Sequence, residues 1–240
     1  LILMSNIRLF YPENIIDNST SLLSKEHTHY VVNVMRLKRG SNLNFFNKNG
    51  EWNSEIVFLD KDRVEVKFLN KVKEPVSPLN IELAICLVKK NPMATILQKA
   101  TELGVSKITP IISERTEVKE LNYERAKKIV VEATEQSNQL SPPEISKVIK
   151  LKDFLNNLDS STKLLFADVN SKDNLKKETS SEVKYFSVLI GPEGDFSPSE
   201  RKLILQTSNI IPFTLSKNIL RSDTAVISAI SLVNFINNIH

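Results

Sequence analysis

The stretch from Val188 to Ser197, VLIGPEGDFS, decides the fold class, because an apolar run of strand length passes directly into a bend built from two glycines and a proline. Ser197 and Glu200 then open a helix as a capping box. A strand, a bend and a helix in this order are typical of parallel α/β proteins, which bind ligands beyond the carboxyl ends of their strands. Glycines let the backbone approach a ligand closely, and Pro192 stiffens the bend. The stretch fits a ligand-binding bend, although an ordinary tight turn has the same local pattern.

A second unusual bend lies further along the chain, in the stretch FTLSKNILRSDTA from Phe213 to Ala225. A strand ends there in a polar turn and is followed by Ile219 and Leu220, two apolar residues that need a surface to cover, either the core or a flat ligand. Arg221 stands just before the expected helix cap, where the helix dipole disfavours a cation. This position indicates either a functional arginine or a simple surface arginine.

The chain around these bends alternates between strands and helices. Strands are expected at 81–88, 108–112, 144–149, 163–169, 185–190 and 210–215. Helices are expected from Asn91, as cap, to Gly104, at 123–137, after Ser197 and at 223–239. This alternation predicts a mostly parallel α/β sheet.

The N-terminal part has a different pattern and ends at a proline-containing seam, KEPVSP, at residues 73–78. Strands expected at 41–47 and 51–60 flank Asn49-Gly50, a strong hairpin signal, and residues 63–68 alternate polar and apolar side chains. A short helix is expected near 24–36. A small β-barrel or curled sheet fits best, so we expect one domain at 1–73 and a second at 74–240.

Charge and cysteine content favour a cytoplasmic protein with an RNA partner. The chain has 240 residues and a net charge of +4, and 11 basic against 8 acidic residues fall within 1–73, where a module that grips phosphates would need them. Cys86 lies between apolar neighbours and is expected to be a buried thiol. The three histidines show no zinc-ligand spacing, and no apolar run reaches the roughly 18 residues of a membrane span. We therefore expect neither a metal site nor a membrane segment.

Seven short motifs in order, covering nearly the whole chain, resemble the bacterial 16S rRNA (uracil-N3)-methyltransferase family (RsmE type) of the SPOUT superfamily. These motifs are Arg8-Leu9-Phe10, a segment from His29 to Gly40, LQKATELGV from Leu97, Ser113-Glu114-Arg115, EATEQS from Glu132, IGPEGDFSPSE from Ile190 and LSKNILRSDTA from Leu215.

The resemblance implies an N-terminal PUA-like β-barrel that binds RNA and a SPOUT-type α/β domain with a C-terminal trefoil knot. It also implies a homodimer that transfers a methyl group from S-adenosylmethionine (SAM) to N3 of a uridine in 16S rRNA of the small ribosomal subunit. The cofactor residues expected from the two bends are Leu189, Ile190, Gly191, Pro192, Glu193, Gly194, Leu215, Ser216, Ile219, Leu220, Thr224 and Ala225. The expected RNA-binding residues, whose alternative is a solvated basic face, are Arg8, Arg36, Lys38 and Arg39.

The chain departs from the family pattern at three places. Asp195 stands where the family usually has a second glycine, Ser216 stands at another usual glycine, and Asn138-Gln139 replaces a common Gly-Arg. A positive φ at Ser216 would cost about 1 kcal/mol or more. The loss of the arginine could remove one RNA contact.

Arg221 is the expected catalytic residue. Uracil N3 is a poor nucleophile until its proton leaves, and a fixed cation near O2 and O4 would favour the resulting anion. Glu193 and Asp223 are both acids on the two bends, and the choice of general base stays open between these and other groups.

Two other functions compete with this one. The first is another SPOUT RNA methyltransferase, for example one that acts on a ribose 2′-oxygen. The second is a non-catalytic RNA-binding factor in ribosome assembly, against which the intact Gly191, Glu193, Leu220 and Arg221 argue. A nicotinamide enzyme is disfavoured, because no Gly-x-Gly-x-x-Gly follows the first strand of the α/β part.

Overall fold

The computed structural model describes residues 7–76, 80–173, 175 and 185–236. The chain divides into two compact units, the first formed by Leu1–Ser77 with Thr134–Ser141 and the second by Pro78–Ala133 with Pro142–His240. The division at Ser77 falls inside the expected seam. No pattern in the sequence indicated that a segment as distant as Thr134–Ser141 joins the N-terminal unit.

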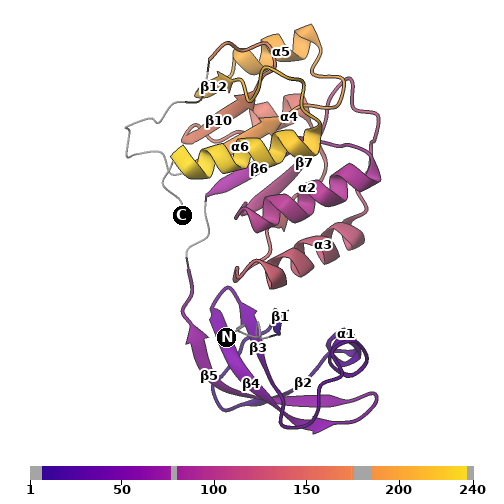
Figure 1. Cartoon of the computed structure of the whole chain (residues 1–240). Helices are drawn as coiled ribbons and strands as arrows, with labels where there is room; N and C mark the ends of the chain where they lie inside the picture. Colours follow the sequence, from indigo (N-terminus) through magenta and orange to yellow (C-terminus); the bar gives the residue numbers. More distant parts are fainter. Residues whose placement is uncertain (1–6, 77–79, 174, 176–184, 237–240) are drawn as a thin grey trace. The chain divides into compact units, whose positions relative to one another are not determined.

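The first unit contains a five-stranded sheet in the order β1-β3-β4-β5-β2. Its strands are β1 (Arg8–Phe10), β2 (Thr20–Leu22), β3 (Asn42–Asn47), β4 (Gly50–Leu59) and β5 (Val64–Lys73). β1 runs parallel to β3, and the other neighbours are antiparallel. Three register irregularities between β4 and β5 bend the long strands, because each bulge increases the local twist. The result is the curled sheet seen in Figure 1.

The predicted hairpin is confirmed, with Asn47 paired to Gly50 across the turn. Gly50 has a φ of +138°, and a Cβ atom there would lie 2.5 Å from the Lys73 carbonyl oxygen, so the position needs glycine. The expected short helix is also present as α1 (Lys25–His29), which continues into a π-helical turn, η1 (Tyr30–Val34). Ser24 caps α1 by accepting a hydrogen bond from the His27 amide.

The second unit is built on a parallel sheet in the order β12-β10-β11-β6-β7-β8, with β9 also paired to β7. The strands are β6 (Ile81–Cys86), β7 (Lys107–Ile112), β8 (Glu144–Ile145), β9 (Ile149–Lys150), β10 (Thr162–Ala167), β11 (Tyr185–Ile190) and β12 (Ile210–Phe213). The helices are α2 (Lys90–Glu102), α3 (Tyr123–Gln136), α4 (Leu151–Asn156), α5 (Pro198–Leu205) and α6 (Ser222–Ile236). The last residues of α3, from Thr134, belong to the first unit.

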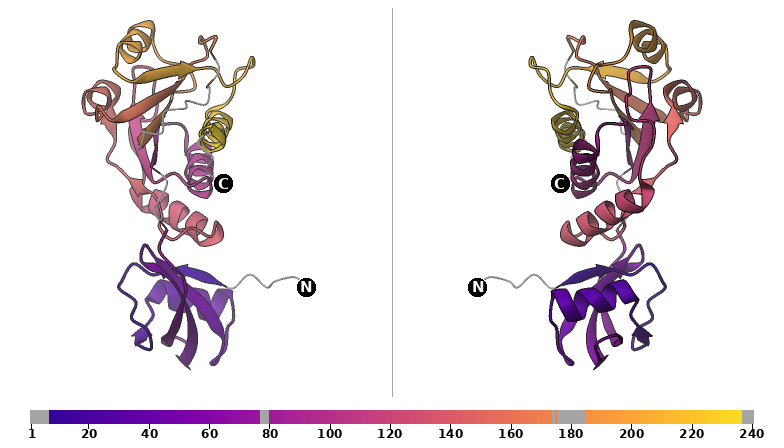
Figure 2. Two further views of the ribbon diagram at one scale, coloured as in Figure 1. Left: turned by 90° about the vertical axis from the view of Figure 1, so that its left-hand side faces the viewer. Right: turned by 90° about the vertical axis from the view of Figure 1, so that its right-hand side faces the viewer.

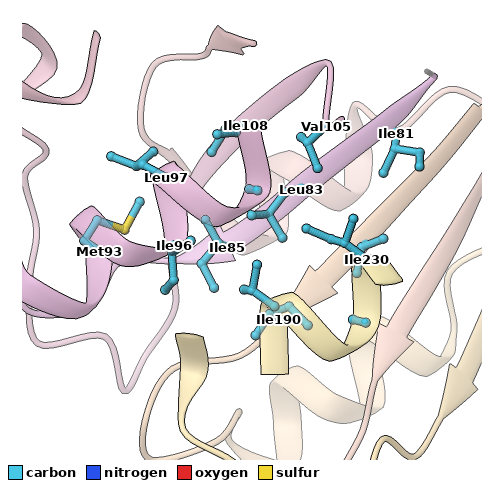
Figure 3. Packing of buried hydrophobic residues seen from close by; sticks show 14 of the residues in the cluster. Ile81, Leu83, Ile85, Met93, Ile96, Leu97, Val105, Ile108, Ile190 and Ile230 are labelled. Carbon is cyan, nitrogen blue, oxygen red and sulfur yellow. The ribbon is translucent and has the colours of Figure 1, made fainter. Parts of the chain in front are cut away.

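Both faces of this sheet are covered by helices, as Figure 2 shows for α2 and α6 on one side and α4 and α5 on the other. Successive side chains of a strand point to opposite faces. Ile81, Leu83 and Ile85 of β6 therefore pack with α2 and α6 (Figure 3), whereas Ala84 and Cys86 pack with α4 and α5. Burial on both faces explains why the strands appear in the sequence as continuous apolar runs.

Three local expectations were wrong or incomplete. Asn91 does not cap α2, because the helix begins earlier with Lys89 at the N-cap and without a side-chain cap. The strand expected at 144–149 is split into β8 and β9, and the short helix α4 that follows was not anticipated. Gly104 does end α2, with a φ of +87° just past the helix.

None of the helices among the described residues combines the length and the apolar character that a bilayer crossing needs.

Candidate functional site

The two bends chosen from the sequence line one cavity of about 760 Å³ at the carboxyl ends of β10, β11 and β12. The first, residues 191–197 after β11, is called the β11 bend below. The second, residues 214–221 after β12, is called the β12 loop. Because β10 lies between β11 and β12 in the sheet, the two segments face each other across its end.

Most of the residues expected to hold a cofactor line this cavity. They are Ile190, Gly191, Pro192, Glu193, Gly194, Leu215, Ser216, Ile219, Leu220 and Ala225, and Arg221 lies among them. Leu189 instead points into the opposite face of the sheet and is fully buried in its core. Thr224 is exposed on the first turn of α6 and lies outside the lining.

The β11 bend is held in place by the packing of Phe196 and by a hydrogen bond that closes its turn. A Cβ atom on Gly191 would lie 3.0 Å from the ring of Phe196, which itself packs edge-on against Phe166 at 5.7 Å between centroids. The Asp195 amide donates to the Pro192 carbonyl at 2.9 Å and closes the turn. Gly191 therefore allows the Phe196 ring to pack closely beneath the backbone of the bend.

Asp195 has a φ of +58°, so the position where the family has glycine does adopt the left-handed conformation. Its Oδ1 accepts a hydrogen bond from the Phe196 amide at 2.8 Å, a local bond of the kind that makes this conformation tolerable for aspartate. Ser216 is not among the described residues with positive φ, so the strain considered for it is absent.

The β12 loop is ordered by its own polar side chains. Ser216 Oγ accepts a hydrogen bond from the Asn218 amide at 3.0 Å, and Thr214 Oγ1 donates to the Ser216 carbonyl at 3.2 Å. Ile219 is 93% exposed at the end of this loop. The Arg221 carbonyl accepts the Ala225 amide at 2.8 Å, which places Arg221 directly at the start of α6 and at the cavity wall.

Sequence reasoning missed the third side of the cavity, which is formed by the end of β10. Asp168 has a side chain only 1% exposed, and its Oδ2 accepts from Arg201 of α5, from Nη2 at 2.6 Å and from Nε at 3.0 Å. These hydrogen bonds raise the pKa of the Arg201 guanidinium.

The sequence offered one signal for Asp168, a polar residue at the end of an apolar strand. Placing Asp168 in the cavity from that signal required knowing that β10 lies next to β11. Asp223, a candidate for the general base, also lines the cavity, and the other lining residues that were not expected are Pro92, Ala167, Val169, Asp195, Thr214, Asn218 and Ser222.

The lining combines apolar and acidic surface. Its charged residues among those described are Arg221 and four acids, Asp168, Glu193, Asp195 and Asp223. Acids of this kind can accept hydrogen bonds from ligand hydroxyl groups and favour a nearby positive charge. The cavity therefore suits a ligand with a flat apolar part, hydroxyl groups and a cationic centre.

The expected RNA-binding residues fall into two groups. Arg36, Lys38 and Arg39 are exposed between η1 and β3, and no described residue makes an ion pair or a hydrogen bond with their side chains. Lys38 and Arg39 lie in a turn that includes Gly40, with a φ of +83°.

Arg8 has a structural role that the sequence did not indicate, and its RNA contact stays a prediction. Its side chain is 12% exposed and is paired with Glu51, and its guanidinium also donates to the carbonyls of Glu135 at 2.9 Å and Gln139 at 2.8 Å. Arg8 thereby anchors the segment Thr134–Ser141 within the first unit. Asn138 in this segment has a φ of +60°, in keeping with the glycine usual there in the family.

Comparison with known proteins gives consistent relatives for both units. Residues 75–234 match a family model described as an RNA methyltransferase domain, and residues 23–69 match an RNA methyltransferase PUA domain. The chain is 34% identical over 96% of both chains to ribosomal RNA small subunit methyltransferase E of Rickettsia conorii. It is 32% identical to the protein of the same name from Aquifex aeolicus, over 95% of this chain and 100% of the relative.

The fold agrees with that of a solved relative. A crystal structure of a ribosomal RNA small subunit methyltransferase E from Neisseria gonorrhoeae, bound to S-adenosyl methionine, superimposes with a TM-score of 0.89 at 29% identity. The match covers 96% of this chain and 98% of that one. The α/β class, with a PUA domain and a parallel-sheet methyltransferase domain, is thereby confirmed.

Proposed function

Because the chain belongs to the ribosomal RNA small subunit methyltransferase E family, we propose that it transfers the methyl group of SAM to N3 of a uridine in 16S rRNA of the small ribosomal subunit. The observation that carries this proposal is the single cavity that the β11 bend and the β12 loop form at the carboxyl ends of the parallel strands. Ligands of parallel α/β proteins bind at this end of the sheet.

The residues of the cavity fit SAM. Its volume of about 760 Å³ lies within the range of ordinary small-molecule sites. Ile190, Leu215 and Leu220 offer apolar surface for the adenine ring. The carboxylates of the lining offer acceptors for ribose hydroxyls and a favourable field for the sulfonium. Gly191, Pro192 and Gly194 line the cavity along the β11 bend and leave its wall with little side-chain bulk.

SAM would supply a methyl group bound to a sulfonium, and the thioether that leaves after the transfer needs no proton. The protein has to bring uracil N3 into line with that methyl group and to favour loss of the N3 proton. We assign the second task to Arg221, because a fixed cation at the cavity wall stabilises the negative charge that spreads over O2 and O4. The general base stays open between Glu193, Asp223 and other groups, since both acids line the cavity.

RNA binding is assigned to the PUA domain. Arg36, Lys38 and Arg39 extend from one exposed segment and are free of ion pairs with other described residues, so they can contact phosphates. Neutralising these three residues should weaken RNA binding and reduce its dependence on salt.

We also propose that the protein is a homodimer through the outer face of α6. Ile227, Ser231 and Phe235 follow one another at a spacing of four residues and are exposed, with Phe235 at 70%. Ile219, at the rim of the cavity, is exposed as well. A second copy packed on this face would bury these side chains, and contact with Ile219 would extend the interface to the cavity. Analytical ultracentrifugation that finds only monomers at micromolar concentration would exclude the dimer.

The C-terminal segment is further proposed to form the trefoil knot of the SPOUT superfamily. Support comes from the return of the chain after β12, the edge strand, to place α6 against α2 and β11 in the interior of the sheet. An experimental map in which this segment passes outside the preceding loop would exclude the knot.

The function is tested by deleting the gene and measuring N3-methyluridine in digested 16S rRNA by mass spectrometry. Loss of this nucleoside, restored by the wild-type gene, is the expected result. Loss of a 2′-O-methylated nucleoside instead would show a different methyltransferase, and an unchanged nucleoside profile would favour a non-catalytic factor.

A matched pair of variants tests the role of Arg221. Arg221→Ala should bind SAM within a few fold of the wild type but lose methyl transfer to small subunits. Lys217→Ala removes a cation from the same loop at a position outside the cavity lining and should keep full activity. Unchanged turnover in Arg221→Ala would remove this residue from the mechanism.

A further inference from the structure

We propose that the turn at residues 113–116, which follows β7, positions the cofactor site, and that Arg115 does so by holding the Gly194 carbonyl of the β11 bend. This inference rests on the proposed function. Ser113-Glu114-Arg115 is one of the motifs singled out in the sequence, yet neither Glu114 nor Arg115 lines the cavity. The turn therefore acts on the ligand through the backbone of the bend.

The turn itself is rigid, because its two ends are tied together inside the protein. The Ser113 amide donates to Thr116 Oγ1 at 2.9 Å, and the hydroxyl groups of the two residues lie 2.8 Å apart. Ser113 is 4% exposed and Thr116 is 2% exposed. Between these buried ends, Glu114 and Arg115 are presented outward at a fixed position.

Glu114 connects the turn to the start of α5. Its amide donates to Glu200 Oε1 at 2.8 Å, while Glu200 Oε2 accepts the Ser197 amide at 3.1 Å in the capping box. The Glu200 side chain belongs to a residue that is only 8% exposed. A single buried carboxylate thus joins the turn after β7 to the end of the β11 bend, two segments far apart in the sequence.

Arg115 holds the middle of the same bend. Its Nη1 donates to the Gly194 carbonyl at 2.8 Å, and the amide of the next residue, Asp195, donates to the Pro192 carbonyl at 2.9 Å. The peptide unit between Gly194 and Asp195 is therefore held at both its carbonyl and its amide. Rotation of this unit would redirect the backbone of Gly194, which lines the cavity. Glycine has no side chain to prevent such a rotation, so an external hydrogen bond has to do so.

The test measures SAM affinity by calorimetry and the kinetic constants for the RNA substrate with full-length Arg115→Ala. We expect the dissociation constant for SAM to rise about tenfold, the range of one lost charge-assisted hydrogen bond. The KM for RNA and the melting temperature should stay unchanged, because the residue is exposed. Arg115→Lys retains a donor and should recover most of the affinity.

Arg125→Ala is the matched control, since Arg125 is an exposed arginine of the same unit outside the cavity lining. Its affinity for SAM should equal that of the wild type. An unchanged SAM affinity in Arg115→Ala together with a raised KM for RNA would overturn the proposal and make Arg115 an RNA contact. Equal losses in both arginine variants would overturn it too. A wild-type protein that does not bind SAM would instead contradict the proposed function.

Discussion

Replacing Arg201 by methionine should destabilise the protein by about 2–3 kcal/mol. Asp168, whose side chain is 1% exposed, would then keep the hydrogen bond that its Oδ1 accepts from the Asn170 amide at 2.9 Å, but it would lose its counter-ion from α5. Breaking a buried ion pair from one side costs about 3–5 kcal/mol. We expect a cost below that range, because the Arg201 side chain is 35% exposed and water can reach the vacated position.

Urea denaturation of the single and double variants measures this interaction directly. Asp168→Asn removes the charge, so that Arg201→Met should cost much less in its presence. The coupling free energy between the two changes is expected to be at least about 1.5 kcal/mol. The melting temperature of Arg201→Met should fall by roughly 5–10 °C for a chain of this size.

The control is Arg63→Met, which breaks a pair with Glu65 whose side chains are 62% and 26% exposed. Such surface pairs contribute about 0–1 kcal/mol, so this variant should be nearly neutral. A cost below about 0.5 kcal/mol for Arg201→Met, or additive costs in the double variant, would refute the view that the ion pair fastens β10 to α5 at the cavity.

Four further outcomes are expected. Asp195→Gly should change stability by less than about 1 kcal/mol in urea denaturation, because relief of strain at its φ of +58° is offset by the lost hydrogen bond from the Phe196 amide and by the freedom of glycine in the unfolded chain. Cys86 should resist thiol reagents in the native protein and react only after unfolding, because burial raises the pKa of its thiol to about 12. Burial also lowers the pKa of His27, so the stability that the neutral side chain contributes is complete above the unfolded pKa of about 6.5 and is lost as the pH falls below that value. In His27→Phe the free energy of unfolding should therefore depend less on pH below about 6.5. Phe235→Glu should shift the protein toward monomers in sedimentation, because the charge would lie in the proposed α6 interface.

The elements that depend on local chemistry could be predicted from the sequence. Ser197 and Glu200 form the capping box, and Gly50 forms the hairpin, because in each case the necessary partners lie within a few residues. The cavity could be predicted too, since parallel strands bring their carboxyl ends together.

The remainder depends on contacts between distant segments. Asp168 enters the cavity only because β10 lies between β11 and β12, an order that no local pattern contains. Arg8 was expected either to bind RNA or to belong to a solvated basic face, and neither expectation indicated a side chain that is only 12% exposed. Its burial depends on Glu51 and on carbonyl groups of Glu135 and Gln139, more than 120 residues further along the chain.

The anchoring of Thr134–Ser141 by Arg8 also decides how the two units can be separated. The polypeptide passes from one unit to the other at three places, after Ser77, after Ala133 and after Ser141. A gene fragment that stops at residue 77 would omit the carbonyl groups that satisfy the Arg8 guanidinium. A chimaera that takes the first unit from a relative must therefore also take the segment Thr134–Ser141 from that relative. Chimaeras joined at a single point should express poorly.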